Sequence, residues 1–471
     1  CILTPKMFDA GNHKNIELLT WSEVEKVEGY IGNFTVTIRK RARYVDEALC
    51  NGCGVCQEKC PKKVVDEVFE AGLGYRKAVY VPFPQAVPKF PVIDRENCNF
   101  FQKGTCKLCE KFCPTGAIKY DQEDTILTVK VGNIILATGY DLFDARRIPQ
   151  YGYGRIPNVF TSLEFERMTN AAGPTGGKVV LRDGVTQPKS VAIIHCVGSR
   201  DRNYNNYCSA ICCMQSLKFA HLVGEKTGAE VYQCYIDIRT PAKAYDEFYQ
   251  RIIEEGVHFI RGRVAEVTDA PRDRSEEGRI VVQVEDTLVG KQRRIPVDMV
   301  VLSAGLEARA DAKEVGKKFG ISCSADAWFI EKHPKLDPVA TMTDGVFVAG
   351  ACQGPKDIPD SVAQGAAAAA RVLSIIGQGE IEIDAATAIV NEETCVGCKE
   401  CIPSCPYTAI EFLEDKRKAH VIEALCKGCG TCVGTCLSKS ISLRHFTDEQ
   451  LVAEMIGAMR TMKSFEKAGV E

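Results

Sequence analysis

The 471-residue sequence lacks an excess of either charge and any long hydrophobic run. Its 59 basic and 62 acidic side chains give a formal charge of −3, so composition indicates neither nucleic acid nor an anionic membrane as a partner. The longest apolar candidate, "GAAAAARVLSII" at residues 365–376, is well short of the ~18 residues that a membrane span needs. We therefore expect no membrane-spanning segment and no nucleic-acid partner.

A glycine-rich nucleotide loop is missing at one strand-to-helix junction. The sequence predicts a buried strand at "KSVAII" (189–194) and a helix at "QSLKFAHLV" (215–223). In two-domain flavin reductases such a junction carries Gly-x-Gly-x-x-Gly, whose glycines let the backbone approach a pyrophosphate. Residues 195–214, "HCVGSRDRNYNNYCSAICCM", lack that pattern. We therefore expect no nicotinamide site at this junction.

Cysteine, in contrast, is abundant, with 24 residues. In a small secreted domain this number would indicate disulfides, but here the cysteines fall in tight runs along a large chain, which is typical of metal binding. We therefore expect a reducing, cytoplasmic setting. The sequence begins with "CILTPKM" rather than with Met, and we expect further residues upstream in the intact protein.

Two cysteine runs between residues 44 and 118 have ferredoxin spacing. They are "CNGCGVCQEKCP", from residue 50, and "CNFFQKGTCKLCEKFCP", from residue 98. In bacterial ferredoxins three cysteines of one run share a cubane with the last cysteine of the other. The gap after the first cysteine of the second run is longer than usual. The predicted ligands are Cys50, Cys53, Cys56 and Cys113 for the first [4Fe-4S] cluster and Cys60, Cys98, Cys106 and Cys109 for the second.

The same pattern recurs near the C-terminus. The runs are "CVGCKECIPSCP", from residue 395, and "CKGCGTCVGTC", from residue 426. Cys-x2-Cys pairs also occur in zinc ribbons, but zinc has little use for a third cysteine two residues further on, repeated in paired runs, so the spacing favours iron–sulfur clusters. The predicted ligands are Cys395, Cys398, Cys401 and Cys436 for a third cluster and Cys405, Cys426, Cys429 and Cys432 for a fourth.

The junction without a nucleotide loop holds four more cysteines. Cys196 ends the predicted strand, Cys208 and Cys212 lie one helical turn apart if the following helix has begun by Cys208, and Cys213 is adjacent to Cys212. Ligands from a strand end and a helix start could converge on a fifth cluster, for which helix amides would offset negative charge. The alternative is a set of buried apolar cysteines. The remaining cysteines are expected to be core or unassigned: Cys1, Cys234, Cys323 and Cys352.

Two segments are similar to the flavin-binding turns of disulfide-reductase flavoproteins. "IILATGY" (134–140) is a strand and turn, and "GVFVAGACQGPKDIPDSVAQGAAAAARVL" (345–373) is a strand, a glycine turn and an alanine-rich helix. The free N–H groups of such a helix favour an anionic reduced flavin, although alanine-rich helices also simply pack closely against sheets. Ala351 replaces the usual acidic residue. The candidate FAD contacts are Ala137, Thr138, Gly139, Gly350, Ala351, Gly354, Pro355, Lys356, Asp357, Ile358, Pro359 and Gln364.

The order of these segments predicts an α/β protein with a discontinuous core. Strand-like residues 32–45 and 125–140 flank the first ferredoxin module, which indicates an insertion. We expect a two-domain, thioredoxin-reductase-like flavoprotein core with an inserted and a C-terminal two-cluster ferredoxin domain. The predicted domains are 1–43 with 119–185 and 297–380 for FAD, 44–118 for the inserted ferredoxin, 186–296 for a second nucleotide-binding-like domain, 381–446 for the C-terminal ferredoxin and 447–471 for a helix.

Several motifs together resemble the family of heterodisulfide reductase A subunits (HdrA) over essentially the whole chain. They are "CILTPKM", "RKAVYVPFPQAVP", "HCVGSRD", "GPKDIPDSVAQGAAAAA" and the two ferredoxin modules. The resemblance implies an FAD protein rich in [4Fe-4S] clusters that performs electron bifurcation between a CoM-S-S-CoB type disulfide and ferredoxin. It also implies the B and C subunits of heterodisulfide reductase, a hydrogenase or formate dehydrogenase, and a homodimer of the complex as partners. The family's glycine-rich FAD fingerprint lies upstream of this sequence.

Three alternatives remain from the sequence. The chain could be the related subunit of a benzoyl-CoA reductase or quinone-linked complex, in which only the final acceptor differs. It could be a nicotinamide-linked flavoprotein like the small subunit of glutamate synthase, against which the missing glycine loop argues. It could also be a non-catalytic electron-relay scaffold without flavin.

Overall fold

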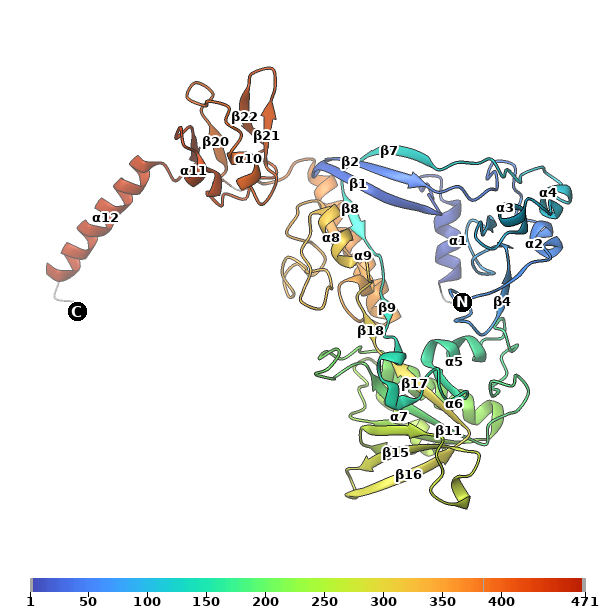
Figure 1. The fold of residues 1–471 in the computed structure, drawn as a ribbon. Coiled ribbons are helices and arrows are strands. Elements are labelled where there is room, and N and C mark those ends of the chain that lie inside the picture. Colours follow the sequence, from blue (N-terminus) through green and yellow to red (C-terminus); the bar gives the residue numbers. More distant parts are fainter. Residues whose placement is uncertain (1–2, 384, 468–471) are drawn as a thin grey trace.

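The computed structural model describes residues 3–383 and 385–467, with side chains described through residue 460. A short helix, α1 (Thr4–Asn12), precedes a three-stranded antiparallel sheet. In Figure 1 this sheet runs between a cysteine-rich module and the flavin-type segments, and the α/β core lies below them. The mixed α/β class predicted from the sequence is confirmed. None of the helices in the described residues has the length and apolar content to cross a bilayer.

The inserted module leaves and re-enters the three-stranded sheet at neighbouring strands. The sheet has the order β1 (Ser22–Tyr30), β2 (Asn33–Lys40) and β7 (Thr125–Val131). Lys40 at the end of β2 pairs directly with Thr125 at the start of β7. The Ala42 N–H donates to Asp124 Oδ1 at 2.9 Å, which closes the base of the insertion. The two connections between the inserted module and the rest of the chain, after Lys40 and before Thr125, are therefore held by one sheet. We call these connections chain crossings.

Within the inserted module, short strands and single-turn helices surround a core made partly of cysteines. Tyr44, Val79, Ile93 and Ile118 are buried there with Cys56, Cys60, Cys98 and Cys109. The elements are α2 (Val55–Lys59), β3 (Lys63–Val65), β4 (Tyr75–Lys77), β5 (Val79–Tyr80), β6 (Val92–Ile93), α3 (Asn99–Lys103) and α4 (Leu108–Lys111).

The α/β core has three layers. The central five-stranded parallel sheet has the order β10 (Val159–Thr161), β17 (Met299–Ala304), β11 (Ser190–Val197), β12 (Glu230–Tyr235) and β13 (His258–Arg261). Helices α5 (Ser162–Thr169), α6 (Cys212–Thr227) and α7 (Tyr245–Glu254) pack on one face. An antiparallel sheet of β14 (Val264–Thr268), β15 (Ile280–Asp286) and β16 (Lys291–Val297) packs on the other.

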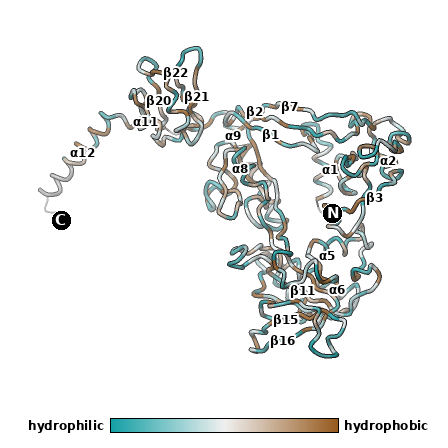
Figure 2. The backbone as a smooth tube through the Cα atoms, in the orientation of Figure 1, coloured by the Kyte–Doolittle hydropathy of each residue, from teal (hydrophilic) through white to brown (hydrophobic). Residues whose placement is uncertain are grey.

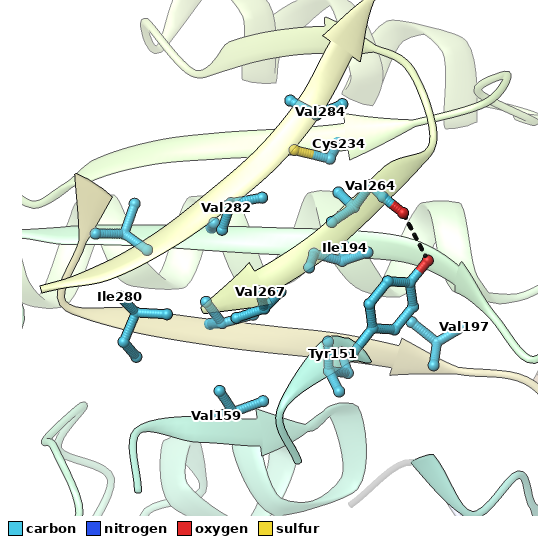
Figure 3. Packing of buried hydrophobic residues seen from close by; sticks show 14 of the residues in the cluster. Tyr151, Val159, Ile194, Val197, Cys234, Val264, Val267, Ile280, Val282 and Val284 are labelled. Atoms are coloured by element: carbon cyan, nitrogen blue, oxygen red, sulfur yellow. Dashed lines mark hydrogen bonds between the residues drawn. The ribbon is translucent and has the colours of Figure 1, made fainter. Parts of the chain in front are cut away.

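Strand β11 is buried along its whole length because both of its faces are covered. Ile193 belongs to the cluster on the helix face and Ile194 to the cluster on the antiparallel-sheet face. Figure 3 shows Ile194 among the valines of β14 and β15, with the Tyr151 hydroxyl donating to the Val264 carbonyl at 3.1 Å. The uninterrupted apolar pattern of residues 189–194 follows from this position.

Residues 257–267 contain two short strands that belong to different sheets. Strand β13 ends at Arg261 and β14 begins at Val264, in a different sheet. At Gly262 between them, a Cβ would lie 1.8 Å from the Glu285 carbonyl oxygen. Only glycine fits this close approach, so the chain changes sheets there.

The flavin-type segments come together in a small parallel pair. Strand β8 (Ile134–Leu136) pairs with β19 (Val346–Val348), and β9 (Asp141–Leu142) pairs with β18 (Leu306–Glu307). Helix α9 (Ile358–Gln378) follows β19, with α8 (Ala312–Phe319) nearby in the sequence. The short 3-10 turns of the core and of this region are η1 (Ala145–Arg147), η2 (Pro149–Tyr151), η3 (Arg274–Glu276) and η4 (Gly350–Cys352).

The C-terminal module has paired short strands and a projecting helix. Lys427 Nζ donates to Asp344, which joins the module to the flavin-type region. Helix α12 extends away from the module (Figures 1 and 2), and its described side chains, up to residue 460, are exposed. Residues 468–471 of the predicted C-terminal helix, like Cys1, lie outside the described residues. The elements are β20 (Ala388–Val390), α10 (Cys401–Ser404), β21 (Ile410–Leu413), β22 (Lys418–Val421), α11 (Thr431–Thr435), β23 (Ile441–Leu443) and α12 (Asp448–Lys467).

Candidate cluster and flavin sites

The first predicted ligand set lies around one small pocket of the inserted module. Cys50, Cys53, Cys56 and Cys113 line this pocket together with apolar side chains that include Val45. Burial, and to a smaller extent the nearby Cys50 and Cys113 thiols, raise the pKa of the Cys56 thiol to about 12. The structure therefore brings together four residues that lie up to 63 positions apart in the sequence (113 − 50).

The second predicted set adjoins the first. Burial raises the pKa of the Cys109 thiol, and the nearby Cys98 and Cys60 also raise it. The Tyr120 hydroxyl lies 3.0 Å from Cys109 Sγ. The fourth predicted ligand, Cys106, lies on the loop before α4 with a left-handed backbone (φ 84°). The Cys109 thiol is also close enough to Cys56 to raise the pKa of that thiol, so the two sets are neighbours.

The C-terminal module repeats this arrangement. Burial raises the pKa of the Cys401 thiol, with further increases from Cys398, Cys395 and Cys436. The Ser440 N–H lies 3.2 Å from Cys436 Sγ and donates to it. The fourth set, which lines a second pocket with Leu443, consists of Cys405, Cys426, Cys429 and Cys432. Burial, and to a smaller extent the other three thiols of the set, raise the pKa of the Cys432 thiol to about 11.

The fifth predicted set lies at the end of β11. Burial, and to a smaller extent the Cys213 and Cys208 thiols, raise the pKa of the Cys196 thiol to about 11. Cys212 is fully enclosed, and burial followed by the other three thiols raises its pKa. The Arg200 guanidinium pairs with Asp237 at 2.6 Å. It acts in the opposite direction on Cys196, because its positive charge lowers the pKa of that thiol. Four thiols therefore occupy the position where a nucleotide loop would otherwise lie.

The expected position of the helix at this set needs a correction. The sequence left open whether the helix begins before Cys208, but α6 begins at Cys212. Ala210 has a left-handed backbone (φ 59°), which interrupts helical geometry just before that point. Cys208 therefore lies on a loop, while Cys212 and Cys213 form the first turn of the helix.

Three of the described cysteines lie outside these sets. Cys234 is buried in the core beside Val264 and Val284 (Figure 3). Cys323 is half-buried near the Ala312 carbonyl, and Cys352 is buried at the flavin-type turn. These positions agree with the expectation of core or unassigned roles.

The donor sets fit iron–sulfur cubanes chemically. Each set has four thiols, which is the number that a [4Fe-4S] cluster binds at its four separate irons. A single zinc ion instead needs its sulfurs within ~2.3 Å of one point. Across the part of the chain that the structure describes, no group of three or more His, Cys, Asp or Glu side chains is arranged to hold one metal ion.

The flavin candidates gather at the carboxyl ends of β8 and β19. The Ala349 N–H donates to the Leu136 carbonyl at 2.9 Å, so the Ala137–Gly139 turn lies beside Gly350. The Gly350 N–H donates to Gln364 Oε1 at 2.7 Å, which ties this turn to α9. The structure thus brings the Ala137–Gly139 turn together with Gly350 and Gln364, and Ala351 and the run Gly354–Pro359 follow Gly350 along the chain.

The start of α9 is capped by one of its own carboxylates and lies next to a half-buried lysine. Asp357 is the N-cap, and its Oδ1 accepts from the Asp360 N–H at 2.9 Å. Pro359 lies in the first turn, where its missing N–H costs nothing. Burial lowers the pKa of the half-buried Lys356 amine, which lies within reach of the Glu331 carboxylate. Ala137 and Thr138 also form one end of a groove of about 790 Å³, a size typical of small-molecule sites.

A short series of contacts connects the flavin-type turn with the fifth cysteine set. Ser209 Oγ, next to Cys208, accepts from the Leu306 N–H at 2.8 Å. Leu306 pairs with Leu142 in the β18–β9 ladder, two residues after Tyr140. Burial raises the pKa of the Tyr140 phenol, and the nearby Cys212 thiol raises it further. The two candidate sites are therefore neighbours.

Sequence reasoning missed several residues at these sites. Tyr140 directly follows the Ala-Thr-Gly turn, and this position next to a predicted flavin contact could have identified it. Tyr120, Glu331 and Tyr245 had none, because the chain brings them to their sites from other elements. Tyr245 on α7 donates to Asp357 Oδ2 at 2.9 Å, which connects the second domain with the cap of α9.

Two family models match the cysteine-rich modules. A 4Fe-4S binding domain matches residues 43–66, and a 4Fe-4S dicluster domain matches residues 388–443. The matches cover the first run of the inserted module and both runs of the C-terminal module. They identify these modules as the 4Fe-4S ferredoxin type rather than as zinc ribbons.

Comparisons of the whole chain point to one family. The iron-sulfur A subunit of the CoB--CoM heterodisulfide reductase of Methanocaldococcus jannaschii is 49% identical over 99% of this chain and 70% of its own length. The A subunit of the H(2):CoB-CoM heterodisulfide,ferredoxin reductase of Methanothermobacter thermautotrophicus is 48% identical over 98% and 68%. The T. acidophilum thioredoxin reductase structure aligns with a TM-score of 0.34 and 15% identity over 52% of this chain and 66% of its own. By its identity to these curated relatives, the chain belongs to the family of heterodisulfide reductase A subunits.

Proposed function

We propose that this chain is the FAD- and [4Fe-4S]-containing electron-transfer subunit of a heterodisulfide reductase complex. In this role it divides electron pairs between a CoM-S-S-CoB type disulfide and ferredoxin. Family membership supports this proposal, and the name of the Methanothermobacter relative includes both the disulfide and ferredoxin. The alternative acceptors, benzoyl-CoA and quinone, do not occur in the names of the relatives compared above.

The observation that carries the proposal is the contact series between the flavin-type turn and the cysteine set at Cys196, Cys208, Cys212 and Cys213. A bound flavin exchanges electrons in pairs and a cubane exchanges them singly, so adjacent sites would convert between the two modes. The N-terminal amides of α9 and the Lys356 amine would hold negative charge at the flavin site.

The positions of the two ferredoxin modules support separate electron routes. The inserted module adjoins the end of the β1–β2–β7 sheet, whereas the C-terminal module follows α9 (Figure 1). Together with the set at the end of β11, they give five predicted clusters in this chain. The proposed partners are the B and C subunits of heterodisulfide reductase, a hydrogenase or formate dehydrogenase, and ferredoxin, with two copies of the complex forming a homodimer.

The test is to purify the complex anaerobically and measure released FAD, iron and electron division. We expect FAD, about 20 iron atoms for the five clusters of this segment, and ferredoxin reduction that requires the disulfide. Iron without FAD would favour the electron-relay scaffold and overturn the proposal. NAD(P)H oxidation would favour the nicotinamide-linked alternative, against which the cysteines at the β11–α6 junction argue.

A further inference from the structure

The phenol of a tyrosine contacts the sulfur of one predicted cluster cysteine. Tyr120 lies just after the inserted module, and its hydroxyl oxygen is 3.0 Å from Cys109 Sγ. The Tyr120 ring is held by Phe100, at a centroid distance of 4.0 Å, and by the edge of Phe101, at 5.7 Å. The Lys107 ammonium lies 5.6 Å from the centre of the same ring. The two aromatic rings and the ammonium therefore fix the phenol in place.

The chemistry of the sulfur determines the direction of this hydrogen bond. A cysteine that binds iron is a thiolate and carries no proton, so the Tyr120 hydroxyl must donate to Cys109. A donated hydrogen bond stabilises negative charge on the sulfur, and a reduced cluster carries one more negative charge than an oxidised one. Hydrogen bonds to the sulfurs are one of the factors that set cluster potentials.

The C-terminal module provides an internal comparison. Cys109 and Cys432 are both the third cysteine of the second run in their modules, and the residue 11 positions later is Tyr120 in one case (109 + 11) and Leu443 in the other (432 + 11). Leu443 lines the pocket of the fourth cysteine set and offers no hydroxyl. The Thr431 hydroxyl lies 3.4 Å from Cys429, a longer contact than that of Tyr120.

We propose that Tyr120 raises the reduction potential of the cluster at Cys60, Cys98, Cys106 and Cys109 above the value that the same site would have without the phenol. Tyr120 is thus a tuning residue of the inserted module, and the C-terminal module lacks its counterpart. The proposal rests on the cluster part of the proposed function, since it requires iron at these four cysteines. It does not depend on which disulfide or partner the complex uses.

The test is a redox titration of the anaerobically purified complex with Tyr120→Phe, followed by electron paramagnetic resonance. We expect one cluster to become harder to reduce by about three- to tenfold in its reduced-to-oxidised ratio at fixed potential, with tenfold equal to about 59 mV for one electron. The other clusters should keep their potentials. The matched control is Tyr44→Phe, because Tyr44 packs on Phe101 at 4.5 Å while its hydroxyl is not among those bonded to a cluster cysteine.

Three outcomes separate this inference from the proposed function. Unchanged potentials with unchanged iron content would overturn the role of Tyr120. Loss of every iron–sulfur signal in the unmodified complex would overturn the proposed function itself. If Tyr120→Phe loses its cluster, proton–deuteron exchange in the unmodified complex decides: an exchangeable proton coupled to the reduced cluster supports the hydrogen bond, and its absence overturns it.

Discussion

The inserted and C-terminal modules have the same cysteine pattern but are attached to the rest of the chain in different ways. The inserted module has two chain crossings, which the β2–β7 ladder fixes at Lys40 and Thr125. It is also held by a bidentate pair between Arg167 and Glu70, at 3.1 and 3.2 Å, whose side chains are only 11% and 15% exposed. The C-terminal module follows α9 through one crossing, with the Lys427–Asp344 pair 28% and 36% exposed.

This difference shows how one building block can serve two mechanical roles. Electron transfer through a protein needs short and constant distances between cofactors, and two crossings with a buried ion pair provide such a constraint. A single crossing with a half-exposed pair leaves the orientation of a module to weak forces. We infer that the inserted module keeps a constant position relative to the α/β core and that the C-terminal module relies more on contacts with its partners.

The largest expected effect comes from removing an equivalent cluster ligand in each module. Cys56→Ala and Cys401→Ala should each lower the iron content by up to about four atoms per chain, because each removes the protein ligand of one iron of a cubane. Both cysteines also belong to the buried cores of their modules, so each variant should lose local protection in hydrogen exchange. Iron and acid-labile sulfide assays measure the loss directly.

The control for these variants is Cys323→Ala, a half-buried cysteine near the Ala312 carbonyl that lies outside the five sets. Its iron content should equal that of the unmodified chain. If Cys56→Ala loses iron and Cys401→Ala does not, the two modules are not equivalent cluster carriers. The comparison between the inserted and C-terminal modules would then fail.

The next effect concerns the anchor of the inserted module. Glu70→Gln removes the charge that pairs with Arg167, and a nearly buried guanidinium left without its partner costs about 1–3 kcal/mol. Amides of residues 63–77, which include Glu70, should exchange about 5- to 100-fold faster, since 1.4 kcal/mol corresponds to tenfold. Hydrogen exchange with mass spectrometry measures this change.

A matched variant in the same module is Glu58→Gln, because the Lys59–Glu58 pair is 43% and 71% exposed. Its exchange rates should change by less than about threefold, as expected for a surface pair. Equal effects of both variants would show that Arg167 does not anchor the module. The first of the two differences between the modules would then disappear.

The cysteine sets could be predicted from the sequence, because the spacing within each run indicates which thiols can bind the same cluster. The sequence also predicted the insertion, because strand-like residues stop and resume around the module. It could not place Tyr120 on Cys109 or Tyr245 on Asp357, since these contacts depend on how separate elements pack rather than on a local pattern. The start of α6 was open for a similar reason: the left-handed backbone at Ala210 has no glycine to signal it.

A smaller effect is expected when the missing phenol is added to the C-terminal module. Leu443→Tyr places a hydroxyl at the position equivalent to Tyr120, beside the pocket of Cys405, Cys426, Cys429 and Cys432. Because the new ring lacks the Phe100 and Phe101 packing that fixes Tyr120, we expect the fourth cluster to become only about two- to threefold easier to reduce. Leu443→Phe controls for ring size. If the reduction potential of the fourth cluster rises equally in Leu443→Phe, the effect comes from packing and not from the hydrogen bond.

The smallest expected effect is on the contact of the C-terminal module with the flavin-type region. Asp344→Asn weakens the pair with Lys427, and a half-exposed pair contributes only about 0.2–1 kcal/mol. Cleavage by a glutamate-specific protease at the exposed Glu380 and Glu382 should therefore accelerate by no more than about fivefold. High salt should produce the same change in the unmodified chain, because screening removes the attraction.

The control is Glu392→Gln, whose pair with Lys416 lies within the module. This variant should leave the cleavage rate unchanged. An acceleration above tenfold with Asp344→Asn would mean that this one pair holds the module in place, so that both modules would be firmly anchored and the contrast between them would be lost.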